Sequence, residues 1–433
     1  MRKFLFLFFL SAAFATAHAQ YVNKQSVRDD FRRDVRQSAS NQMAYPGPSQ
    51  LQLTAPPAGY HPFYISHYGR HGSRYLIGQQ EYDRPFSVLA KADSAGMLTA
   101  KGKEVLLRVA MMRDEAAGRF GELTPLGAQQ HREIASRLYK RFPEIFKGKA
   151  NVDAKSTIVI RCILSMENEL LELMRLNPQL NIRHDASEHD MYYMNLYDRQ
   201  LEKAKRPKAC RDAFDEYYAK YVKPDHLISQ LFSDTAYAYR NTNVKDFYYS
   251  MFRLASNLQN LEARKRITLW DLFDDDEIYN NWHMENMKWY MSYGACPMNG
   301  GKQPFSQRNL LRRIIEEADS CIALPKPGAT LRFGHETMVL PLTCLMGING
   351  YDLETDDIDN LEQKGWINYR VFPMGANIQL VFYRRNAHDK DVLVKVLLNE
   401  NEARLPVKTN SAPYYKWSDF RKYYLDKLAT YKN

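Results

Sequence analysis

The sequence contains few cysteines, and they follow no recognisable motif. Its five cysteines are too sparse among 433 residues for a disulfide-rich scaffold, and no C-x-x-C pair is present, so zinc binding and thioredoxin-like chemistry are disfavoured. Cys162 and Cys344 lie in apolar runs, where we expect buried thiols. Cys210, Cys296 and Cys321 can supply one disulfide bond, and the sequence leaves the pairing open.

Long apolar segments are also lacking. No segment beyond the N-terminus approaches the roughly 20 apolar residues that a membrane-spanning helix needs. The N-terminus combines two basic residues, a short apolar run and small residues around His18, as in a secretory signal peptide cleaved before Gln20. We therefore predict that residues 1–19 are a signal peptide. The mature protein would be exported to the periplasm, or to the outer surface or vesicles, without stable membrane insertion.

Motifs for nucleic acids and metal ions are missing as well. The 60 Lys and Arg residues outnumber the 50 Asp and Glu residues, so the chain should attract anions. The basic residues are scattered, however, and no zinc-finger, RNP-like or helix-turn-helix pattern accompanies them, so nucleic acid is not an expected partner. The acidic runs 274–277 and 356–359 lack the glycine and closing glutamate of an EF-hand loop, and residues 184–190 match no zinc pattern. We expect solvated turns in the acidic runs, and neither a metal nor another cofactor.

The order of apolar patterns favours an α/β fold. Short runs rich in β-branched and aromatic residues alternate with segments of helical periodicity, as expected for a mainly parallel sheet flanked by helices. The clearest helix begins at Thr124, with Pro125 in its first turn, and ends before Pro143. Ser418 is the expected N-cap of a closing helix over residues 419–431. The predicted strands are 61–66, 156–162, 329–334, and a final pair formed by 370–383, with its β-rich part at 378–383, and 391–398.

The composition changes in two places along the chain. Residues 20–57 hold few apolar positions, and we interpret them as a solvent-exposed lead-in with a helix around residues 27–35. From residue 168 to residue 321, β-branched runs nearly vanish, and Leu, Met, Lys, Glu and Tyr recur at helical spacing. We therefore predict a large α-helical subdomain at 168–321, inserted into an α/β domain formed by 58–167 and 322–433.

Residues 68–74, Tyr-Gly-Arg-His-Gly-Ser-Arg, are the most informative segment. They place His71 between Arg70 and Arg74, directly after a predicted strand. An imidazole beside two guanidinium groups is electrostatically unfavourable unless an anion binds between them, which indicates a phosphate pocket that contains a nucleophile. Gly72 is expected to let the backbone approach that anion.

A second segment has the same form. The predicted strand 330–334 leads into His335 and Glu336, and a third predicted strand carries Arg161 at its end. Ligands of open α/β sheets bind beyond the carboxyl ends of the strands, so two strands can bring His71 and His335 to one crevice despite the gap in sequence. The sequence thus predicts one anion site built from separate segments.

These motifs resemble those of a known family. The run from Arg70 to Arg74, Arg161 within Arg-Cys-Ile-Leu-Ser, and the adjacent pair His335-Glu336 are similar to the motifs of histidine acid phosphatases. The resemblance covers residues 58–433 and points to the branch of the histidine phosphatase superfamily that contains phytases and multiple inositol polyphosphate phosphatases. It implies a phosphoric monoester hydrolase whose partner is a small anionic phosphate ester.

The resemblance also implies a role for each site residue. His71 would attack phosphorus and form a phosphohistidine, and Glu336 would protonate the leaving alcohol and then help water to attack the phosphoenzyme. Guanidinium groups would supply charge and positioning without a metal. A mildly acidic pH optimum is expected, because Glu336 must be protonated and its unperturbed pKa of ~4.3 would rise in a dry pocket. The residues that would hold the phosphoryl oxygens are Arg70, Arg74, Arg161 and His335.

The sequence constrains the substrate less closely. An exported phosphatase for phytate or another inositol polyphosphate fits the cationic composition, and a basic stretch in the helical insert can contact additional phosphates or form an ordinary solvated face. One alternative is a broad-specificity acid phosphatase for sugar phosphates or nucleotides. Another, from a different class, is a phosphate-binding protein without turnover, although binding alone would need only the arginines. The basic stretch consists of Lys203, Lys205, Arg206 and Lys208.

Overall fold

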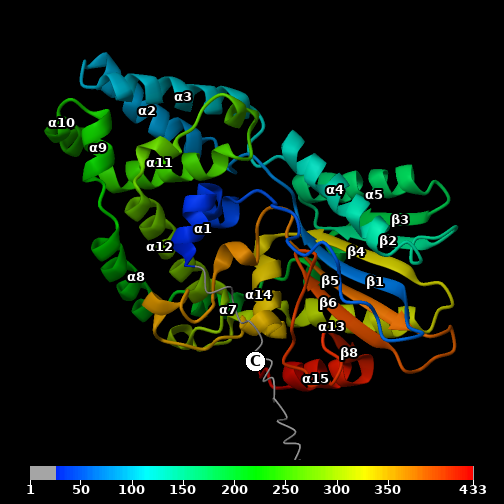
Figure 1. Ribbon diagram of the computed structural model, residues 1–433. Coiled ribbons are helices and arrows are strands. Elements are labelled where there is room, and N and C mark those ends of the chain that lie inside the picture. Colours follow the sequence, from blue (N-terminus) through cyan, green and yellow to red (C-terminus); the bar gives the residue numbers. More distant parts are fainter. Residues whose placement is uncertain (1–25, 433) are drawn as a thin grey trace, which may run out of the picture.

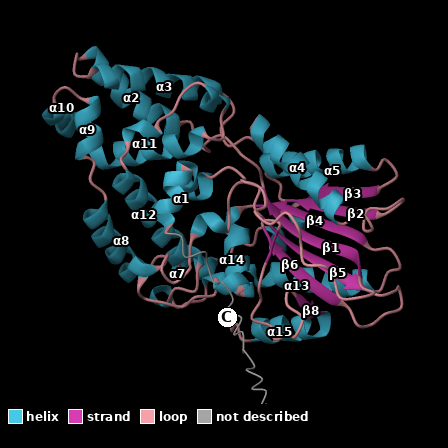
Figure 2. Ribbon diagram, in the orientation of Figure 1, coloured by secondary structure: helices cyan, strands magenta, loops and turns pink. Residues whose placement is uncertain are grey.

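The computed structural model describes residues 26–432, which form two lobes that lie side by side (Figure 1). One lobe contains an eight-stranded sheet, and the other consists of helices (Figure 2). The predicted signal peptide, residues 1–19, lies outside the described residues. Within the described part of the chain, no helix is long and apolar enough to cross a membrane.

The central sheet is mostly parallel, which confirms the predicted fold class. The last strands of the chain extend it on one side in antiparallel pairing. Strands β3 (Asn181–Ala186), β2 (Asn151–Ser156), β4 (Gly328–Gly334) and β1 (His61–Arg70) lie next to one another in this order and run parallel. They are followed by β5 (Asn377–Arg384), β6 (Leu393–Leu398) and β7 (Asn401–Glu402), while β8 (Tyr414–Lys416) pairs with β6.

Helices cover both faces of the sheet. Because side chains alternate along a strand, Ile65 of β1 packs into the core on one face, whereas Tyr64 and Tyr68 pack into the core on the other. Figure 1 shows α4 (Pro125–Arg141) and α5 (Ile160–Leu176) on the first face. The second face is covered by α13 (Arg308–Ile322) and α15 (Trp417–Ala429), and α14 (Glu336–Met346) follows β4.

The helical lobe combines segments from distant parts of the chain. Residues 80–116 form two helices that pack with helices of the predicted insert, and the domain boundaries themselves stay a prediction. The remaining α-helices are α1 (Val27–Arg33), α2 (Gln80–Ser94), α3 (Ala100–Ala116), α6 (Met191–Met194), α7 (Arg199–Ala204), α8 (Lys208–Tyr221), α9 (Asp225–Leu231), α10 (Thr235–Asn241), α11 (Val244–Leu258) and α12 (Asp275–Tyr293). The 3-10 helices are η1 (Val35–Gln42), η2 (Glu188–Asp190), η3 (Glu262–Lys265), η4 (Trp270–Leu272), η5 (Pro297–Asn299), η6 (Gln303–Gln307), η7 (Ile348–Gly350), η8 (Ile358–Asn360) and η9 (Asn368–Arg370).

Three predicted elements are wrong in detail. The strand predicted over 370–383 begins only at Asn377. The run 156–162 is not a strand, because β2 ends at Ser156 and α5 begins at Ile160. Its β-branched residues lie in the short connection and at the start of the helix, where Ile160 is 63% exposed. The closing helix begins at Trp417, so Ser418 lies inside it and is not the N-cap. The helix that begins after Thr124 is confirmed, with the Thr124 side chain accepting from the helix backbone.

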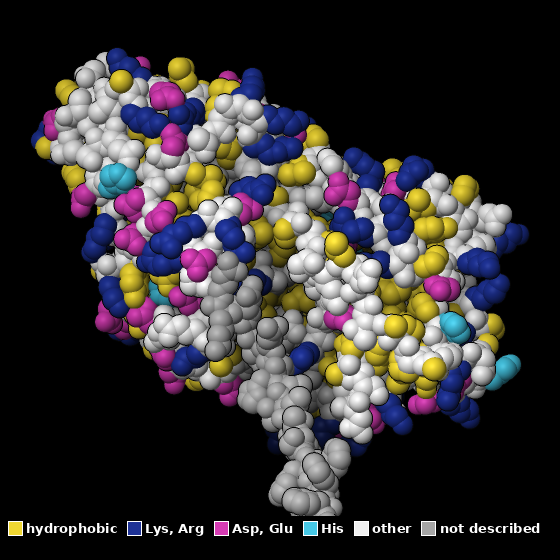
Figure 3. All heavy atoms as spheres, viewed as in Figure 1, with side chains coloured by type: hydrophobic (Ala, Val, Ile, Leu, Met, Phe, Trp, Pro, Cys, Tyr) yellow, Lys and Arg dark blue, Asp and Glu magenta, His cyan; other side chains and the backbone are white. Residues whose placement is uncertain are grey.

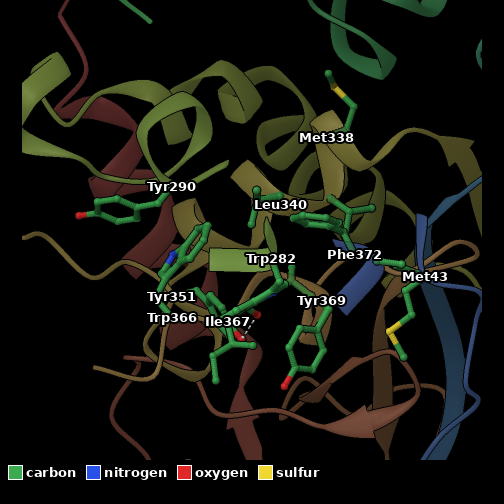
Figure 4. Packing of buried hydrophobic residues seen from close by; sticks show 14 of the residues in the cluster. Met43, Trp282, Tyr290, Met338, Leu340, Tyr351, Trp366, Ile367, Tyr369 and Phe372 are labelled. Atoms are coloured by element: carbon green, nitrogen blue, oxygen red, sulfur yellow. Dashed lines mark hydrogen bonds between the residues drawn. The ribbon is translucent and has the colours of Figure 1, made fainter. Parts of the chain in front are cut away.

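The N-terminal segment is partly buried between Val27 and Met43 and not, as predicted, exposed throughout, whereas residues 44–57 are half-buried or exposed. α1 confirms the expected helix, but Val27 and Phe31 are only 3% and 6% exposed. The ring of Phe31 packs edge-on against Trp282 at a centroid distance of 5.3 Å. Figure 4 shows Trp282 beside Tyr369 in this core, with 5.9 Å between the ring centroids. The prediction failed because much of the burial involves polar side chains, namely Ser38, Ser40 and Gln42.

All five cysteines are free thiols in this structure. Cys162 and Cys344 are buried, which confirms the prediction for these two residues. Cys210, Cys296 and Cys321 form no disulfide bond.

Candidate active site

The two main predicted segments meet at the carboxyl ends of β1 and β4. These strands are parallel neighbours with Arg70 opposite Gly334, and the backbone N–H of His71 donates to the carbonyl of Gly334 over 2.9 Å. The residues that follow the two strands, His71 and His335, therefore lie together, with 5.7 Å between their ring centroids. Strand pairing alone thus assembles the crevice that the sequence predicts.

The loop after β1 is held by α4 and α5. The hydroxyl of Ser165 accepts from the backbone N–H of Gly72 over 3.1 Å, and the side chain of Gln130 accepts from that of Ser73 over 2.8 Å. A Cβ atom on Gly72 would lie 2.5 Å from the carbonyl oxygen of Gly127. The contact that requires glycine here is therefore with α4, whereas the sequence-based expectation was contact with the anion.

His71 presents one unprotonated nitrogen to the pocket. Its Nδ1 lies 2.9 Å from the carbonyl oxygen of Gly72, which can only accept, so Nδ1 carries the proton. Its Nε2 has no hydrogen-bond partner within residues 26–432. Burial, aided by the charge of Arg70, holds the pKa of His71 well below its usual range, although Glu336 acts in the opposite direction. A neutral imidazole with a free Nε2 can serve as a nucleophile.

All three predicted arginines gather at this end of the sheet. Arg70 and Arg74 are 0% and 3% exposed. Arg161 reaches the site from the first turn of α5, not from a strand end, and its Nη1 donates to the carbonyl of Gly121 over 3.4 Å. Burial and the charges of the other two arginines lower the pKa of Arg74 to about 10. Nη2 of Arg70 and Nε of both other arginines are buried and lack a partner among the described residues, which indicates that the site binds an anion.

The start of α14 supplies the other two predicted residues. His335 is the N-cap and Glu336 is the first helical residue. Burial lowers the pKa of His335 to about 4, so its ring is neutral at neutral pH. Oε2 of Glu336 lies 3.1 Å from Nε of Arg70 and 3.7 Å from Nε2 of His71.

The protonation of Glu336 differs from the expectation. Burial by itself raises the pKa of this carboxyl, but the charge of Arg70 and the interaction with His71 outweigh burial. The pKa of Glu336 therefore lies well below its usual range, opposite in direction to the raised pKa that a dry pocket suggested. Glu336 is therefore an ionised carboxylate among guanidinium groups.

Two clusters have the spacing of metal ligands, and each has another explanation. In the pocket, His71, His335 and Glu336 place ligand atoms within 4.8 Å of one another, but the three arginines beside them favour an anion over a cation. In the helical lobe, Asp274 and Glu277 form a capping box at the start of α12. This acidic run is therefore a helix N-terminus and not the solvated turn that we expected.

Sequence reasoning missed three residues that touch the site. Nδ2 of Asn41 donates to Oε1 of Glu336 over 3.2 Å. Thr157 Oγ1 lies 3.3 Å from Nε2 of His335, and Cys162 Sγ lies 3.8 Å from both ring nitrogens. Thr157 directly follows β2, so the rule that ligands gather at strand ends would have found it. Nothing in the local sequence marks Asn41.

The helical lobe contains a cavity. It has a volume of about 570 Å³ and is lined by residues of α8, α11 and α12, among them Lys288, and by Arg206 from the connection before α8. The charges of Glu336 and of Arg206 both act on the phenol of Tyr293, whose pKa is raised mainly by burial. Lys and Arg side chains are visible on both lobes in Figure 3.

The residues of the basic stretch in the insert have different environments in the structure. Arg206 lines the cavity. Lys205 pairs with a carboxylate and lies over the ring of Tyr293, 4.3 Å from its centroid. The side chain of Lys208 is 80% exposed and paired on its own helix, as expected for a solvated face.

A family model described as the histidine phosphatase superfamily (branch 2) matches residues 69–399. The chain belongs to this family. The match includes every predicted site residue of this histidine phosphatase and leaves Asn41 outside. Membership, together with the assembled pocket, makes the protein a phosphoric monoester hydrolase.

Solved structures share the fold of this histidine phosphatase. The Bifidobacterium longum multiple inositol polyphosphate phosphatase in complex with inositol hexasulfate superposes with a TM-score of 0.75 at 18% identity, covering 88% of this chain and 96% of that chain. The phytase from D. castellii gives 0.67 at 15% identity, with 91% and 85% covered. The Hafnia alvei phytase in complex with tartrate gives 0.53 at 14% identity, with 86% and 98% covered. No curated relative matches the sequence.

Proposed function

We propose that this phosphatase works by covalent catalysis at His71. The observation that carries the proposal is the free Nε2 of His71, whose Nδ1 donates to the carbonyl of Gly72. Three arginines, each with a nitrogen that lacks a partner among residues 26–432, lie at the same end of the sheet. They can bind a phosphate group by charge while Nε2 reaches its phosphorus.

The reaction would proceed in two steps. In the first, Nε2 of His71 bonds to phosphorus as the ester P–O bond breaks, and the leaving alcohol takes the proton of Glu336. In the second, water gives a proton to the Glu336 carboxylate and its oxygen bonds to phosphorus as the P–N bond breaks. This step releases inorganic phosphate and restores both side chains. The residues that would hold the phosphoryl oxygens are Arg70, Arg74, Arg161 and His335.

Substrate binding would favour the protonated form of Glu336. The arginines hold the pKa of this carboxyl low, whereas the first step needs a proton on it. A bound phosphate dianion offsets the guanidinium charges, so the pKa of Glu336 rises when substrate binds. Activity should therefore fall as the pH rises beyond the mildly acidic range.

We infer that inositol polyphosphates such as phytate are the preferred substrates. Their ring carries several phosphates, and Arg206 and Lys288, which line the cavity of the helical lobe, are the cations proposed to bind those that are not being cleaved. Two proteins of similar fold support this choice, a phytase and a multiple inositol polyphosphate phosphatase solved with inositol hexasulfate.

A broad-specificity acid phosphatase for sugar phosphates or nucleotides is the second candidate. Lys288 already pairs with Glu285 over 3.0 Å, and two further carboxylates, Asp215 and Asp246, line the cavity. The cavity therefore carries less free positive charge than the pocket, which favours substrates with a single phosphate group.

We also propose that the protein is exported to the periplasm or to the outer surface or vesicles. The sequence of residues 1–19 is the only support for this proposal. N-terminal sequencing of protein recovered from the periplasm should begin at Gln20. Recovery of the uncleaved chain from the cytoplasm alone would contradict export.

The substrate proposal is tested by phosphate release from phytate, a sugar phosphate and an aryl phosphate. Purified mature protein is assayed at mildly acidic pH with a chelator present. The highest kcat/KM is expected for phytate. Activity on the two simple esters alone would favour the second candidate, and release from none of the three would contradict hydrolysis.

A further inference from the structure

We infer that Asn41, from the N-terminal segment, is a positioning residue for Glu336. The inference rests on the proposed role of Glu336 as the acid. Asn41 Nδ2 donates to Oε1 of Glu336 over 3.2 Å, and the other oxygen, Oε2, faces Arg70 and His71. The two oxygens of the carboxyl group therefore have different environments.

This difference decides which oxygen carries the proton. An amide N–H can only donate, so Oε1 accepts from Asn41 in both protonation states of Glu336. Oε2 pairs with Nε of Arg70 over 3.1 Å, and once a bound phosphate offsets the Arg70 charge, Oε2 is the oxygen left to carry the proton. Oε2 is also the oxygen on the side of the nucleophile, where the leaving group arrives. Without Asn41, the carboxyl group can rotate and present its proton elsewhere.

The backbone next to Asn41 is held in a strained conformation. Ser40 has φ 53° and ψ −122°, which interrupts η1 and is unfavourable for a residue with a side chain. The hydroxyl of Ser40 accepts from the side chain of Asn368 over 2.9 Å. Two residues after Asn41, the carbonyl of Met43 accepts from the backbone N–H of Met374 over 2.7 Å. The chain is therefore fixed on both sides of Asn41.

Asn257 and Asn260 each form hydrogen bonds both with the N-terminal segment and with the loop that carries His71. Nδ2 of Asn257 donates to the side chain of Gln42 over 2.9 Å and to the carbonyl of Arg74 over 3.1 Å. Asn260 donates to the carbonyl of Gln42 over 2.8 Å and accepts from the hydroxyl of Ser73 over 2.7 Å. One hydrogen-bond network thus holds the segment and the loop at a fixed distance, as a positioning role requires.

The test compares two substrates with one enzyme preparation. Asn41→Ala should lower kcat roughly ten-fold for an alkyl phosphate, because a hydrogen bond to a charged group is lost, and by less than about two-fold for an aryl phosphate, whose leaving group needs little acid. The ratio of the two rates does not depend on the folded fraction. Asn41→Asp adds a like charge beside Glu336, raises the pKa of that carboxyl and should move the alkaline limb of the kcat profile to higher pH.

The matched control is Gln37→Glu. It adds the same charge to η1, but in this structure the Gln37 side chain donates to the backbone carbonyl of Asp30 and not to the site. The control should change neither the ratio nor the pH profile. The double variant Asn41→Ala/Glu336→Gln should be no slower than Glu336→Gln alone, because Asn41 acts through Glu336.

The outcomes separate this inference from the proposed mechanism. Equal losses on both substrates in Asn41→Ala, or additive losses in the double variant, would overturn the positioning role. If Glu336→Gln still loses far more on the alkyl phosphate, the proposed mechanism stands. Equal losses in Glu336→Gln itself would overturn both.

Discussion

The cations of the phosphate pocket differ from those of the helical lobe in what they pair with. Arg70 and Arg74 are almost fully buried, yet each keeps a nitrogen without a partner among residues 26–432. In the helical lobe, Arg253 pairs with Glu81, and Lys288 pairs with Glu285 over 3.0 Å. An uncompensated buried charge is costly, so the pocket arginines are best explained by an anion that binds there.

The cations of the pocket therefore contribute to catalysis, and those of the cavity contribute to the choice of substrate. Charges of the pocket act on the reacting phosphate, which every substrate has. Charges of the cavity can act only on further phosphates, and Lys288 must first separate from its partner Glu285. Changes in the pocket should therefore slow all substrates strongly, and changes in the cavity should weaken one class of substrate modestly.

The largest effect is expected at the nucleophile. His71→Ala should lower kcat on the order of 10⁴-fold or more on phytate and aryl phosphates alike, because no other described group in the pocket offers a free imidazole nitrogen. Turnover is measured with circular dichroism as the check on folding. Substantial residual turnover by the folded variant would refute the covalent route.

A smaller and substrate-dependent effect is expected at Glu336. Glu336→Gln should slow an alkyl phosphate roughly 10²-fold to 10³-fold and an aryl phosphate much less, because only the alkyl leaving group needs a proton. The measurement is kcat for both esters at one pH. A uniform loss would mean that another group is the acid.

The cavity should show a selective effect. Replacing Arg206 and Lys288 by Gln is expected to lower kcat/KM for phytate about ten-fold and to leave an aryl phosphate unchanged, because only phytate carries further phosphates for these two cations of the cavity to bind. Lys208→Gln is the matched control, since that side chain is exposed and already paired. Equal kcat/KM for phytate in the double variant and the control would show that the cavity does not contribute to substrate recognition.

The smallest effect concerns the stability of the fold, through a histidine buried in the sheet near the pocket. His67 of β1 is buried, and its ring nitrogens lack partners within the described residues. Burial lowers its pKa to about 4 against about 6.5 when unfolded, so its contribution to stability is complete above pH 6.5 and is lost as the pH falls. About 3 kcal/mol should be lost by pH 4.

The check is the free energy of unfolding of His67→Leu and of wild type at pH 7 and at pH 4. The variant should lose less stability between these two values than wild type does. His388→Leu, at an exposed position, is the control and should behave like wild type. An unchanged acid sensitivity in His67→Leu would show that other groups dominate.

Much of the site could be predicted because it follows directly from strands. β1 and β4 read as apolar runs, and the residues after them carry the chemistry, so parallel pairing was enough to bring His71 and His335 together. Arg161 was predicted at the end of a strand, whereas the structure places it in the first turn of α5. Its preceding β-branched run looks like a strand in sequence and instead covers the turn into α5.

Other features depend on contacts that leave no local pattern. β3 is an edge strand with mostly exposed residues, so it lacks the apolar alternation that identifies a strand. Asn41 reaches Glu336 across 295 positions of sequence, through polar residues that are buried by long-range hydrogen bonds. The direction of the Glu336 pKa shift follows from the position of Arg70, which only the folded chain defines.

The central claim is that Nε2 of His71 carries the phosphoryl group during turnover. The most direct test is to quench the enzyme during hydrolysis of an aryl phosphate and to locate phosphate on the protein by mass spectrometry under conditions that preserve phosphohistidine. The expected result is one phosphoryl group per chain, on Nε2 of His71. Phosphate on Nδ1 or on another residue, or burst kinetics without a phosphorylated protein, would contradict it.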